Sequence, residues 1–523
     1  MPAPDLEHFS FDDDGPWEVR REELGWTRGL RVLRATVRRQ VPLLTARRAL
    51  PPPGRLAVVA AHLGGAVAGW AVRERRTGGS TSRAGLSRRL RRAAERLGPT
   101  YIKLGQIISS GAGLFPEELV EEFRACRDQV AAEPFPTVRQ VVEEDLARPL
   151  WDVFSHFEEV PLAAASIAQV HAARLRTGEE VVVKVQRPTI RAQVHADLRV
   201  MAWLAPFLVG RIPVAALANP PALVELFAET IGEELDFRLE AENMLDVAAS
   251  LAELGQRKVI VARPHPELVT RRVLVMERLH GYGFEDIESM HAAGIDTHEV
   301  LRVGMVSFTE GCLVNGIFHG DLHGGNLFIT PDGRIALLDF GITARMTDLE
   351  RNAFLRLMLT GAMGDVRGQI AAFRDLGALP PDTDIGDVIR ELGLDQQPVD
   401  PTTMSQEQLV AELQRITKAL LGMGARLPKI LMLYVKNLVF LDAAIAHLAP
   451  DLDLVAEIAG LSTHLATTHG ERFAAESGLS LEGFRVDETA IRNSLGVFDD
   501  APGMTYRDLR ARRELIRRRL ERS

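Results

Sequence analysis

The spacing of hydrophobic residues changes along the chain and predicts a strand-rich region between helical ones. Residues 86–132 carry apolar positions at helical spacing, and residues 198–252 do so again. Between them, the stretches AQVHAARL and EEVVVKVQ flank a Thr-Gly pair at 177–178. Two apolar stretches of this length around such a pair predict a β-hairpin within residues 160–185.

The second half of the chain is predicted to be helical apart from a few short strands. KVIVA and RRVLVMERL, within residues 258–279, predict two of them. GNLFIT and GRIALLDFG predict another pair, on either side of a Pro-Asp-Gly turn at 331–333. Further on, Thr347 and Glu350 form a capping box, which predicts the start of a helix. A small strand-rich part followed by a mainly helical part favours a fold of two lobes.

Proline and glycine mark the expected breaks between the N-terminal helices. Arginine-rich helices are predicted over residues 20–76, with an interruption by Pro-Pro-Pro-Gly at 51–54. The sequence Thr-Gly-Gly-Ser-Thr-Ser at 77–82 has the composition of a flexible linker. Pro116 is placed for the first turn of a further helix.

Basic residues are concentrated near the N-terminus, although the whole chain is acidic. Residues 20–96 hold nineteen arginines and four acidic residues, an excess of +15, whereas the formal net charge of all 523 residues is −9. Residues 506–523 add eight arginines and three acidic residues. Such clusters attract the phosphate groups of anionic lipid or nucleic acid, although a solvated helix face explains them equally well.

An uncharged segment lies inside this basic region. Residues 56–72, LAVVAAHLGGAVAGWAV, carry no formal charge and are flanked by Arg55 and Arg73. Their number, seventeen, is at the lower limit for spanning a bilayer. We therefore rank an interfacial or core helix above a transmembrane helix at 56–72.

Composition narrows the class of protein. A chain of 523 residues is too long for one compact core, so we expect two or three structural units. Hydrophobic residues make up 46% and charged residues 25%, which is typical of soluble globular proteins. Cys126 and Cys312 lie far apart without a CxxC pair, which favours a reducing cytoplasm over a disulfide framework or a zinc cluster. The acidic start lacks the features of a secretory signal.

The strongest chemical signal is HGDLHGGN at 319–326, followed by Asp-Phe-Gly at 339–341. Phosphoryl transfer needs a carboxylate at the nucleophile and ligands for the metal ion that neutralises the phosphates. Asp321 stands five residues before Asn326, and Asp339 follows thirteen residues later, after a predicted strand pair. This spacing is typical of a kinase catalytic loop and its metal ligands. Asp321 is therefore the candidate catalytic base, Asn326 and Asp339 are the candidate magnesium ligands, and ATP and Mg²⁺ are the expected cofactors.

Lys184 is the candidate for orienting the nucleotide phosphates. It lies in the predicted strand Val-Val-Val-Lys-Val at 181–185, which is the position of the phosphate-binding lysine in kinases. Upstream, the loop expected to cover the nucleotide is PLAAASIA at 161–168, not GxGxxG. Alanine adopts positive φ less readily than glycine, and its methyl group limits how closely the backbone can wrap a phosphate. This loop therefore departs from the usual pattern.

Several motifs together resemble the UbiB family of atypical kinases, also called aarF-domain or ADCK-like proteins. They are PLAAASIAQVHAA, VVVKVQRP, EELDFRLEAEN, HGDLHGGN, DFG and the KxGQ motif within GPTYIKLGQ. The resemblance covers residues 86–450, with the motifs in the family's order. It implies an α+β, atypical protein-kinase-like fold with a small β-containing N-lobe, a helical C-lobe and a helical N-terminal extension.

The resemblance assigns roles to the positions that match the family's motifs. Lys184 would hold the nucleotide, with Glu240 as its ion-pair partner on a helix. As regulatory residues, Lys103 and Gln106 would reach into the active site from the N-terminal extension, with Lys103 near Glu234 and Asp236. The i, i+2 spacing of Glu234 and Asp236 separates them on a helix, so a joint role would need a helix end there. The nucleotide loop would consist of Ala163, Ala164, Ala165 and Ser166.

The resemblance also implies an activity. Family members are associated with isoprenoid-quinone biosynthesis and lipid homeostasis, and with ATPase activity in preference to protein phosphorylation. In this chain only Ile-Thr-Ala-Arg-Met separates Gly341 from the capping box, so a long activation segment and an APE motif are missing. Two departures from the family concern Gly324, which stands where a proline is frequent, and the paired C-terminal transmembrane helices of some members, which we do not find here.

From these observations we expect five regions. They are an acidic tail and arginine-rich helices (1–85), the KxGQ extension (86–135), an N-lobe with inserted helices (136–280), a C-lobe (281–500) and a basic C-terminal helix (501–523). The expected partners are ATP, a lipid or quinone precursor, an anionic membrane surface and a complex of biosynthetic enzymes. The expected location is cytoplasmic and peripheral, at the inner face of the membrane.

Other functions stay open at this point. A true protein kinase would place phosphate on itself or on a partner, and a nucleotide-switched adaptor or chaperone would bind lipid-biosynthesis enzymes. A zinc hydrolase built on His319 and His323 lacks a third histidine motif in the sequence. Nucleic-acid binding ranks last, because few aromatic residues and no readout motif accompany the basic region.

Overall fold

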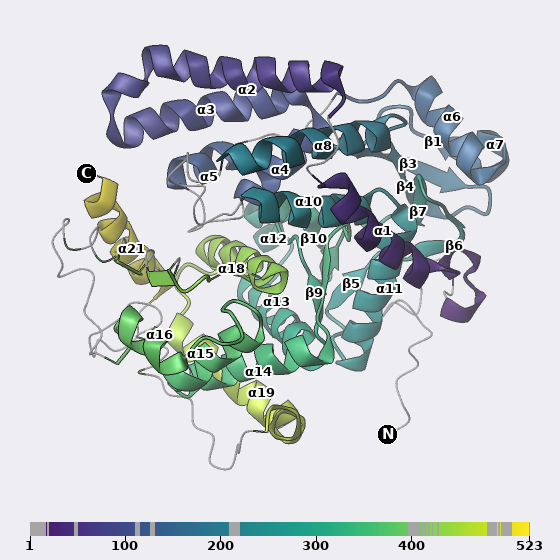
Figure 1. Cartoon of the computed structure of the whole chain (residues 1–523). Helices are drawn as coiled ribbons and strands as arrows, with labels where there is room; N and C mark the ends of the chain where they lie inside the picture. The colour runs from purple at the N-terminus through teal and green to yellow at the C-terminus, as the bar shows by residue number, and fades with distance from the viewer. Residues whose placement is uncertain are drawn as a thin grey trace. The chain divides into compact units, whose positions relative to one another are not determined.

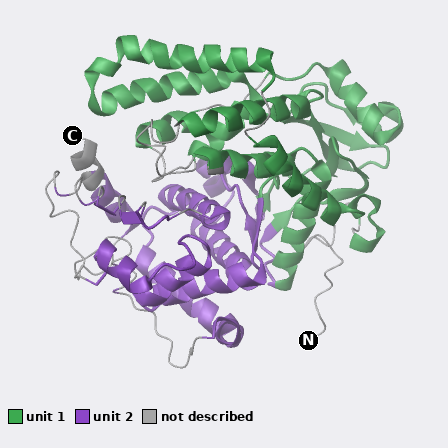
Figure 2. Cartoon of the chain, viewed as in Figure 1, with its two compact units in different colours: residues 1–253, 260–280, 336–342 green, residues 254–259, 281–335, 343–523 purple. Residues whose placement is uncertain are grey.

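The computed structural model describes residues 20–46, 51–109, 116–125, 131–208, 220–395, 428–478 and 505–521, with Trp17 and single positions within 408–425 and at 489 and 492. The chain divides into two compact units, which Figure 2 shows in green and purple. Unit 1 consists of residues 1–253, 260–280 and 336–342, and unit 2 of residues 254–259, 281–335 and 343–523.

Unit 1 contains an antiparallel sheet with the strand order β1-β3-β4-β7-β6, and β2 pairs with β3 (Figure 1). The hairpin predicted within 160–185 is confirmed as β3 and β4, and Gly178 in its turn has a φ of 109°. The strand β6 was not predicted. The strands are β1 (Phe154–Phe157), β2 (Ala163–Ala164), β3 (Ala168–Leu175), β4 (Glu180–Gln186), β6 (Pro264–Val269) and β7 (Val273–Glu277), while β5 (Val259–Val261) and β11 (Ile335–Leu337) contain residues of both units.

Helices make up the rest of unit 1. The linker predicted at 77–82 is wrong, because Gly79–Ser82 form the first turn of α3, which packs against α2. The α-helices are α1 (Leu30–Leu44), α2 (Pro53–Arg73), α3 (Gly79–Leu97), α4 (Pro99–Ser109), α5 (Glu117–Arg124), α6 (Phe135–Leu146), α7 (Leu150–Val153), α8 (Ile190–Leu208), α10 (Pro220–Glu234) and α11 (Phe237–Glu253), with single 3₁₀ turns at Arg21–Glu23, Gly25–Thr27 and Arg75–Thr77.

The two faces of strand β4 have different surroundings because successive side chains of a strand point to opposite sides. Val181, Val183 and Val185 are buried in a core that α6 and α7 complete with Val142 and Leu150. Lys184 therefore points to the other face of the sheet. Helix α11 packs on β6 and β7, and it supplies the partner that a buried lysine needs.

Unit 2 is mainly helical, with short antiparallel strand pairs β9–β12 and β8–β10. The capping box predicted at Thr347 and Glu350 is confirmed at the start of α14. Its helices are α12 (Ile287–Ala292), α13 (Thr297–Glu310), α14 (Asp348–Ala362), α15 (Val366–Asp375), α16 (Ile385–Leu392), α18 (Lys429–Leu448), α19 (Leu454–Ser477) and α21 (Tyr506–Glu521), and its strands are β8 (Tyr282–Gly283), β9 (Ile317–His319), β10 (Leu327–Ile329) and β12 (Thr343–Arg345). A π-helical turn (Gly311–Asn315) follows α13, and a 3₁₀ turn covers Gly324–Asn326.

The fold is the predicted α+β class, with a sheet-containing unit, a mainly helical unit and a helical N-terminal region. Two helices are long and apolar enough to cross a membrane by length and composition, α2 and α18. They differ in burial, which is 6% of the apolar window in α2 and 33% in α18. The five predicted region boundaries stay predictions.

Candidate nucleotide site

Lys184 lies at the centre of a cluster of charged residues in unit 1. Its Nζ is 2.6 Å from Oε1 of Glu240, near the start of α11, and 3.4 Å from Oδ2 of Asp339. The Lys184 and Glu240 side chains are only 10% and 3% exposed, whereas the Asp339 side chain is 46% exposed. The structure thus brings together the predicted lysine, its predicted helix partner and one predicted metal ligand.

The charges in this cluster stabilise one another. Burial alone would lower the pKa of Lys184, but the attraction of Asp339 and Glu240 outweighs burial and raises it above the usual value. Burial raises the pKa of Glu240, and the neighbouring Lys184 cation opposes that rise. Lys184 is therefore a permanently charged group that faces an accessible carboxylate.

The Asp-Phe-Gly turn is anchored to the same part of unit 1. The Gly341 N–H donates to Oδ1 of Asp339 at 2.8 Å, and Nδ2 of Asn243 on α11 donates to the Phe340 carbonyl at 2.7 Å. The Phe340 side chain is fully buried. These contacts fix the backbone on both sides of the Asp339 carboxylate, so that it is held next to Lys184.

The lysine of the KxGQ motif joins the cluster through α10. Lys103 Nζ on α4 lies 3.1 Å from Oε2 of Glu234, the last residue of α10. A Cβ atom on Gly341 would lie 3.5 Å from Cγ of Glu234, so this carboxylate borders the Asp-Phe-Gly turn. Asp236 follows in the connection to α11, and it forms a bidentate ion pair with Arg238 at 2.9 and 2.7 Å. A helix end therefore separates Glu234 from Asp236, and the first pairs with Lys103 whereas the second pairs with Arg238.

The glycine and glutamine of the motif have different surroundings. A Cβ atom on Gly105 would lie 2.4 Å from the Phe123 ring of α5, so glycine lets these two helices pack closely. Gln106 follows Lys103 by three residues on α4, which places both on one side of that helix. The structure thus explains the motif's glycine by packing.

The alanine-rich loop is a tight turn that the backbone and an arginine hold in place. Ala163 and Ala164 pair with β3, and the Ala165 N–H donates to the Ala168 carbonyl at 2.8 Å. Arg187 donates to the Ala165 carbonyl from both Nε and Nη2 at 3.2 Å. Ser166 is 2% exposed. Arg187, which sequence reasoning did not single out, therefore takes part in fixing the loop.

The catalytic loop of unit 2 is held by α18. Nζ of Lys436 forms an ion pair with Oδ1 of Asp321, and both side chains are largely buried, at 15% and 16% exposed. The adjacent Asn437 is fully buried, accepts from the Leu322 N–H at 3.1 Å and donates to the His319 carbonyl. His319 Nδ1 accepts from the Asp321 N–H at 3.1 Å, which agrees with a structural role in the loop.

Sequence reasoning missed Lys436 and Asn437. They lie 115 residues after Asp321 and Leu322, outside every motif. Their signal is that a lysine and an asparagine stand in the middle of a twenty-residue helix that is otherwise strongly apolar. Polar groups inside such a helix need partners when they are buried.

Asn326 in unit 2 and Asp339 in unit 1 each offer an oxygen of the kind that a magnesium ion binds. Asn326 Nδ2 donates to the Asp321 carbonyl at 2.9 Å, which leaves its side-chain oxygen as the metal-binding atom. Asp339 supplies an accessible carboxylate oxygen. Among the described residues no group of three or more His, Cys, Asp or Glu could hold a metal by itself. Magnesium typically takes one or two protein oxygens, with water and substrate phosphate as its other ligands.

Comparison with known proteins agrees with the motifs. Residues 125–372 match the ABC1 atypical kinase-like domain. The uncharacterized protein Rv0647c of Mycobacterium tuberculosis is 36% identical over 370 residues, which cover 69% of this chain and 74% of that protein. The aarF domain-containing protein kinase At5g05200 of Arabidopsis thaliana is 32% identical, with coverage of 70% and 72%. A probable protein kinase UbiB of Vibrio parahaemolyticus is 30% identical, with coverage of 71% and 68%.

A solved structure is also similar, the complex of Rv3197 with erythromycin from Mycobacterium tuberculosis. It covers 66% of this chain and 91% of that chain at 22% identity, with a TM-score of 0.37, and adds nothing to the assignment. The fold and the sequence matches define an atypical kinase-like protein. The chain belongs to the ABC1 family, which includes the UbiB and aarF domain-containing kinases, as its motifs predicted.

Proposed function

We propose that this protein binds ATP with magnesium and either hydrolyses it or transfers its γ-phosphoryl group to a small lipid-like molecule. The observation that carries the proposal is the contact of Lys184 with both Glu240 and Asp339, at 2.6 and 3.4 Å. In kinases, phosphoryl transfer requires the lysine–glutamate ion pair and the Asp-Phe-Gly aspartate to be in place together. In unit 1 Lys184 contacts both carboxylates, which supports the proposal.

In unit 1 the proposed roles are binding and orientation. The raised pKa of Lys184 keeps it charged for the α and β phosphates, and Glu240 holds its ammonium group on one side. Asp339 and, from the catalytic loop, Asn326 would hold the metal, which when bound supplies neutralisation of the phosphate charge. Ala163, Ala164, Ala165 and Ser166 would border the nucleotide.

In unit 2 the proposed role is activation of the nucleophile. Asp321 would accept a hydrogen bond from the attacking water or hydroxyl group and orient it. The Lys436 ammonium group forms an ion pair with the Asp321 carboxylate and holds it in place. Asn437 holds the backbone of the loop on both sides of Asp321. This set of contacts supports Asp321 as the base.

A small acceptor or water is favoured over a protein substrate. Ala344 of β12 pairs with Phe318 of β9 only three residues after Gly341, and α14 starts at Asp348. The segment that forms a peptide-docking platform in protein kinases is therefore reduced to a short strand. Lys103 and Gln106 of the KxGQ extension would regulate access, with Glu234 as the acidic partner of Lys103 and Asp236 beside it.

The surface of α2 supports a membrane-facing role in isoprenoid-quinone or other lipid metabolism. Val58, Val67 and Val72 are 42%, 47% and 82% exposed. Val58 and Val72 lie on one side of α2, and Val67, nine residues after Val58, lies on the opposite side. A groove of about 290 Å³ lies between His62 on α2 and Arg92 and Arg96 on α3. Exposed apolar side chains next to arginines suit an interfacial helix on anionic lipid at the cytoplasmic face. This interpretation of α2 ranks above a transmembrane helix.

A nucleotide-switched adaptor for biosynthetic enzymes is the second candidate. Lys184 would then bind the nucleotide, and its ion pairs would change when the nucleotide is released. ATP hydrolysis would be slow. A true protein kinase is the third candidate, supported by the names of relatives such as the probable protein kinase UbiB.

The test is ATP hydrolysis by the purified chain with magnesium, with and without anionic liposomes, beside Asp339→Asn. The proposal expects turnover that rises with liposomes and is lost in the variant. If the wild type binds ATP but hydrolyses none under either condition, the enzyme proposal fails in favour of the adaptor. Phosphate appearing on the protein itself or on an added protein would favour the protein kinase.

A further inference from the structure

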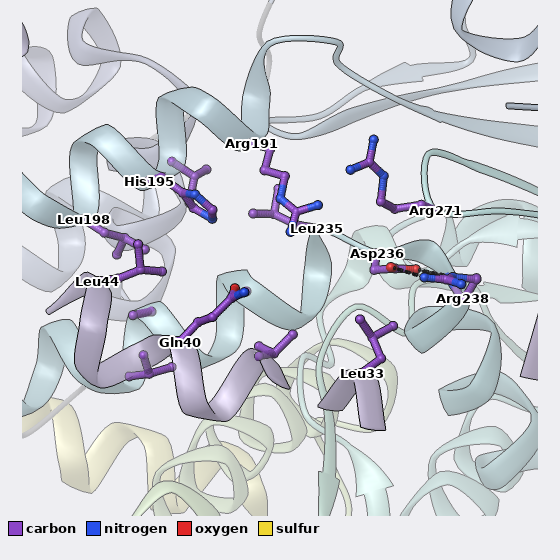
Figure 3. A pocket seen from close by; sticks show the side chains of 15 residues that line it. Leu33, Gln40, Leu44, Arg191, His195, Leu198, Leu235, Asp236, Arg238 and Arg271 are labelled. Atoms are coloured by element: carbon purple, nitrogen blue, oxygen red, sulfur yellow. Dashed lines mark hydrogen bonds and ion pairs between the residues drawn. The ribbon is translucent and has the colours of Figure 1, made fainter. Parts of the chain in front are cut away.

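A cavity in unit 1 lies between helices α1, α8 and α10, and the proposed reaction makes no use of it (Figure 3). Its volume is about 160 Å³. One side of it is apolar and comes mostly from the half-buried face of α1 and the buried faces of α8 and α10. The apolar lining residues are Leu33, Val37, Val41, Leu44, Val194, Leu198, Ala228 and Leu235.

The other side of the cavity is polar and basic. Arg191 and His195 extend over it from α8, and Gln40 extends toward them from α1 (Figure 3). Arg271 completes this side from the turn before β7. Its guanidinium and that of Arg191 have no carboxylate partner among the described residues.

The acidic residue in the lining is already neutralised. Asp236 is the one carboxylate among the described lining residues, and it forms a bidentate pair with Arg238 at 2.9 and 2.7 Å. Burial lowers the pKa of His195, and the nearby Arg191 and Arg199 lower it further. Positive charge is therefore in excess at one end of a cavity that is apolar at the other.

We propose that this cavity binds a small amphipathic anion, a phosphate or carboxylate attached to an apolar group. A comparable apolar cavity of roughly 150 Å³ accepts a benzene-sized group, so the apolar part would have about six carbon atoms inside the cavity. Arg191 and Arg271 hold the anionic head by charge-assisted hydrogen bonds. The apolar part packs against the leucine and valine side chains of α1 and α8.

The cavity includes none of the proposed catalytic, metal-binding or nucleotide-binding residues, and its ligand needs no nucleotide. A soluble metabolite and a lipid whose head enters the cavity share the required chemistry. The connection between α10 and α11 borders both sites, because Leu235 and Asp236 line the cavity directly after Glu234, the partner of Lys103.

Isothermal titration of the full chain with hexyl phosphate tests the proposal. We expect a Kd at least tenfold lower than for inorganic phosphate or hexanol alone, since both halves of the ligand contribute. The variant Arg191→Ala/Arg271→Ala should lose at least tenfold in affinity, and Val41→Phe, which fills the apolar end, should lose a similar factor. Arg39→Ala is the matched control, because Arg39 is exposed on α1 outside the cavity, and its affinity should equal that of the wild type.

Two results would overturn the proposal. If inorganic phosphate and hexyl phosphate bind with equal affinity, the arginines bind phosphate without help from the apolar side of the cavity. If the double variant and Arg39→Ala bind hexyl phosphate with equal affinity, the ligand binds outside the cavity. Vesicles of phosphatidylcholine containing phosphatidic acid identify the source of the ligand. If these vesicles displace hexyl phosphate, the natural ligand is a lipid headgroup. If hexyl phosphate binds and the vesicles do not displace it, the natural ligand is a soluble anion.

Discussion

The charged cluster of unit 1 and the charged cluster of unit 2 are built in different ways. In unit 1, Lys184 lies between the carboxylates of Glu240 and Asp339. Lys103 pairs with Glu234, and both glutamates belong to the EELDFRLEAEN motif. In unit 2, the Asp321 carboxylate is held by Lys436 from a helix that belongs to no motif. In the first cluster two carboxylates surround the Lys184 ammonium group. In the second, the Asp321 carboxylate pairs with the Lys436 ammonium group.

The exposure of the carboxylates in the two clusters also differs. Glu240 is 3% exposed, so it stabilises the fold only while Lys184 neutralises it. Asp321 keeps some exposure, as a group that must meet a substrate does. Removing Lys184 should therefore reduce the stability of unit 1 as well as nucleotide binding, whereas removing Lys436 from unit 2 should mainly reduce the reaction rate.

The largest expected effect is that of Asp321→Asn on catalysis. The amide cannot accept a proton, so kcat for ATP hydrolysis should fall about a thousandfold, within the usual range for a general base. Steady-state kinetics measure this, with Asp332→Asn as the control, because Asp332 is an exposed turn residue of the same unit. An unchanged kcat in Asp321→Asn would remove this residue from the mechanism.

The next effect is that of Lys184→Met on stability. The change leaves Glu240 buried without its cation, and we expect a loss of about 3 kcal/mol in the free energy of unfolding. Urea denaturation measures it. The double variant Lys184→Met/Glu240→Leu should regain most of this stability while still failing to bind ATP. A double variant as unstable as the single one would show that the pair is not the cause.

The pH dependence of Lys184→Met follows from the same contact. Burial already raises the pKa of Glu240 in the folded protein, and the loss of Lys184 raises it further. A group whose pKa is higher in the folded state contributes stability below its unfolded pKa and loses that contribution as the pH rises through the folded value. Lys184→Met should therefore be more stable, relative to the wild type, at pH 6 than at pH 8. The opposite trend would contradict a buried, partnerless Glu240.

A smaller effect is expected for Asn437→Leu. The Leu322 N–H and the His319 carbonyl would each lose a buried partner, which should lower the free energy of unfolding by about 2 kcal/mol. The control is Val435→Ala, because Val435 is 38% exposed on the same helix. Equal loss in both variants, measured by urea denaturation, would argue against a specific role for the asparagine.

The smallest effect is that of Lys436→Met on the reaction. Loss of the ion pair should lower kcat about tenfold, which corresponds to about 1.4 kcal/mol of lost stabilisation. Lys436→Arg keeps the charge and should retain most of the rate. If Lys436→Arg loses as much activity as Lys436→Met, the positive charge at this position does not explain how Lys436 supports Asp321.

The sequence predicted the parts of the site that lie within short motifs. The hairpin with Lys184 could be predicted because two apolar stretches flank a Thr-Gly pair, and the capping box at Thr347 because its hydrogen bonds are local. The pairing of Lys184 with Glu240 followed from resemblance to a family. The contacts of Lys436 and Asn437 depend on how a distant helix packs, and local spacing carries no information about that.

Some local predictions failed for a related reason. Gly-Gly-Ser-Thr-Ser at 78–82 has a linker's composition, but α3 packs against α2, and Trp70 Nε1 donates to the Ser82 carbonyl at 3.0 Å. Tertiary packing thus overrides weak helix propensity there. The expectation that Asp236 lies near Lys103 stays a prediction, and the structure adds that Asp236 forms a bidentate pair with Arg238 at the helix connection.

The most direct test of the account is the magnesium dependence of ATP binding, measured by isothermal titration of the wild type and Asp339→Asn. We expect magnesium to tighten ATP binding to the wild type and this gain to be lost in the variant, which should keep its fold because the Asp339 side chain is 46% exposed. Equal ATP affinity of the wild type with and without magnesium, or a magnesium gain that survives in Asp339→Asn, would contradict it.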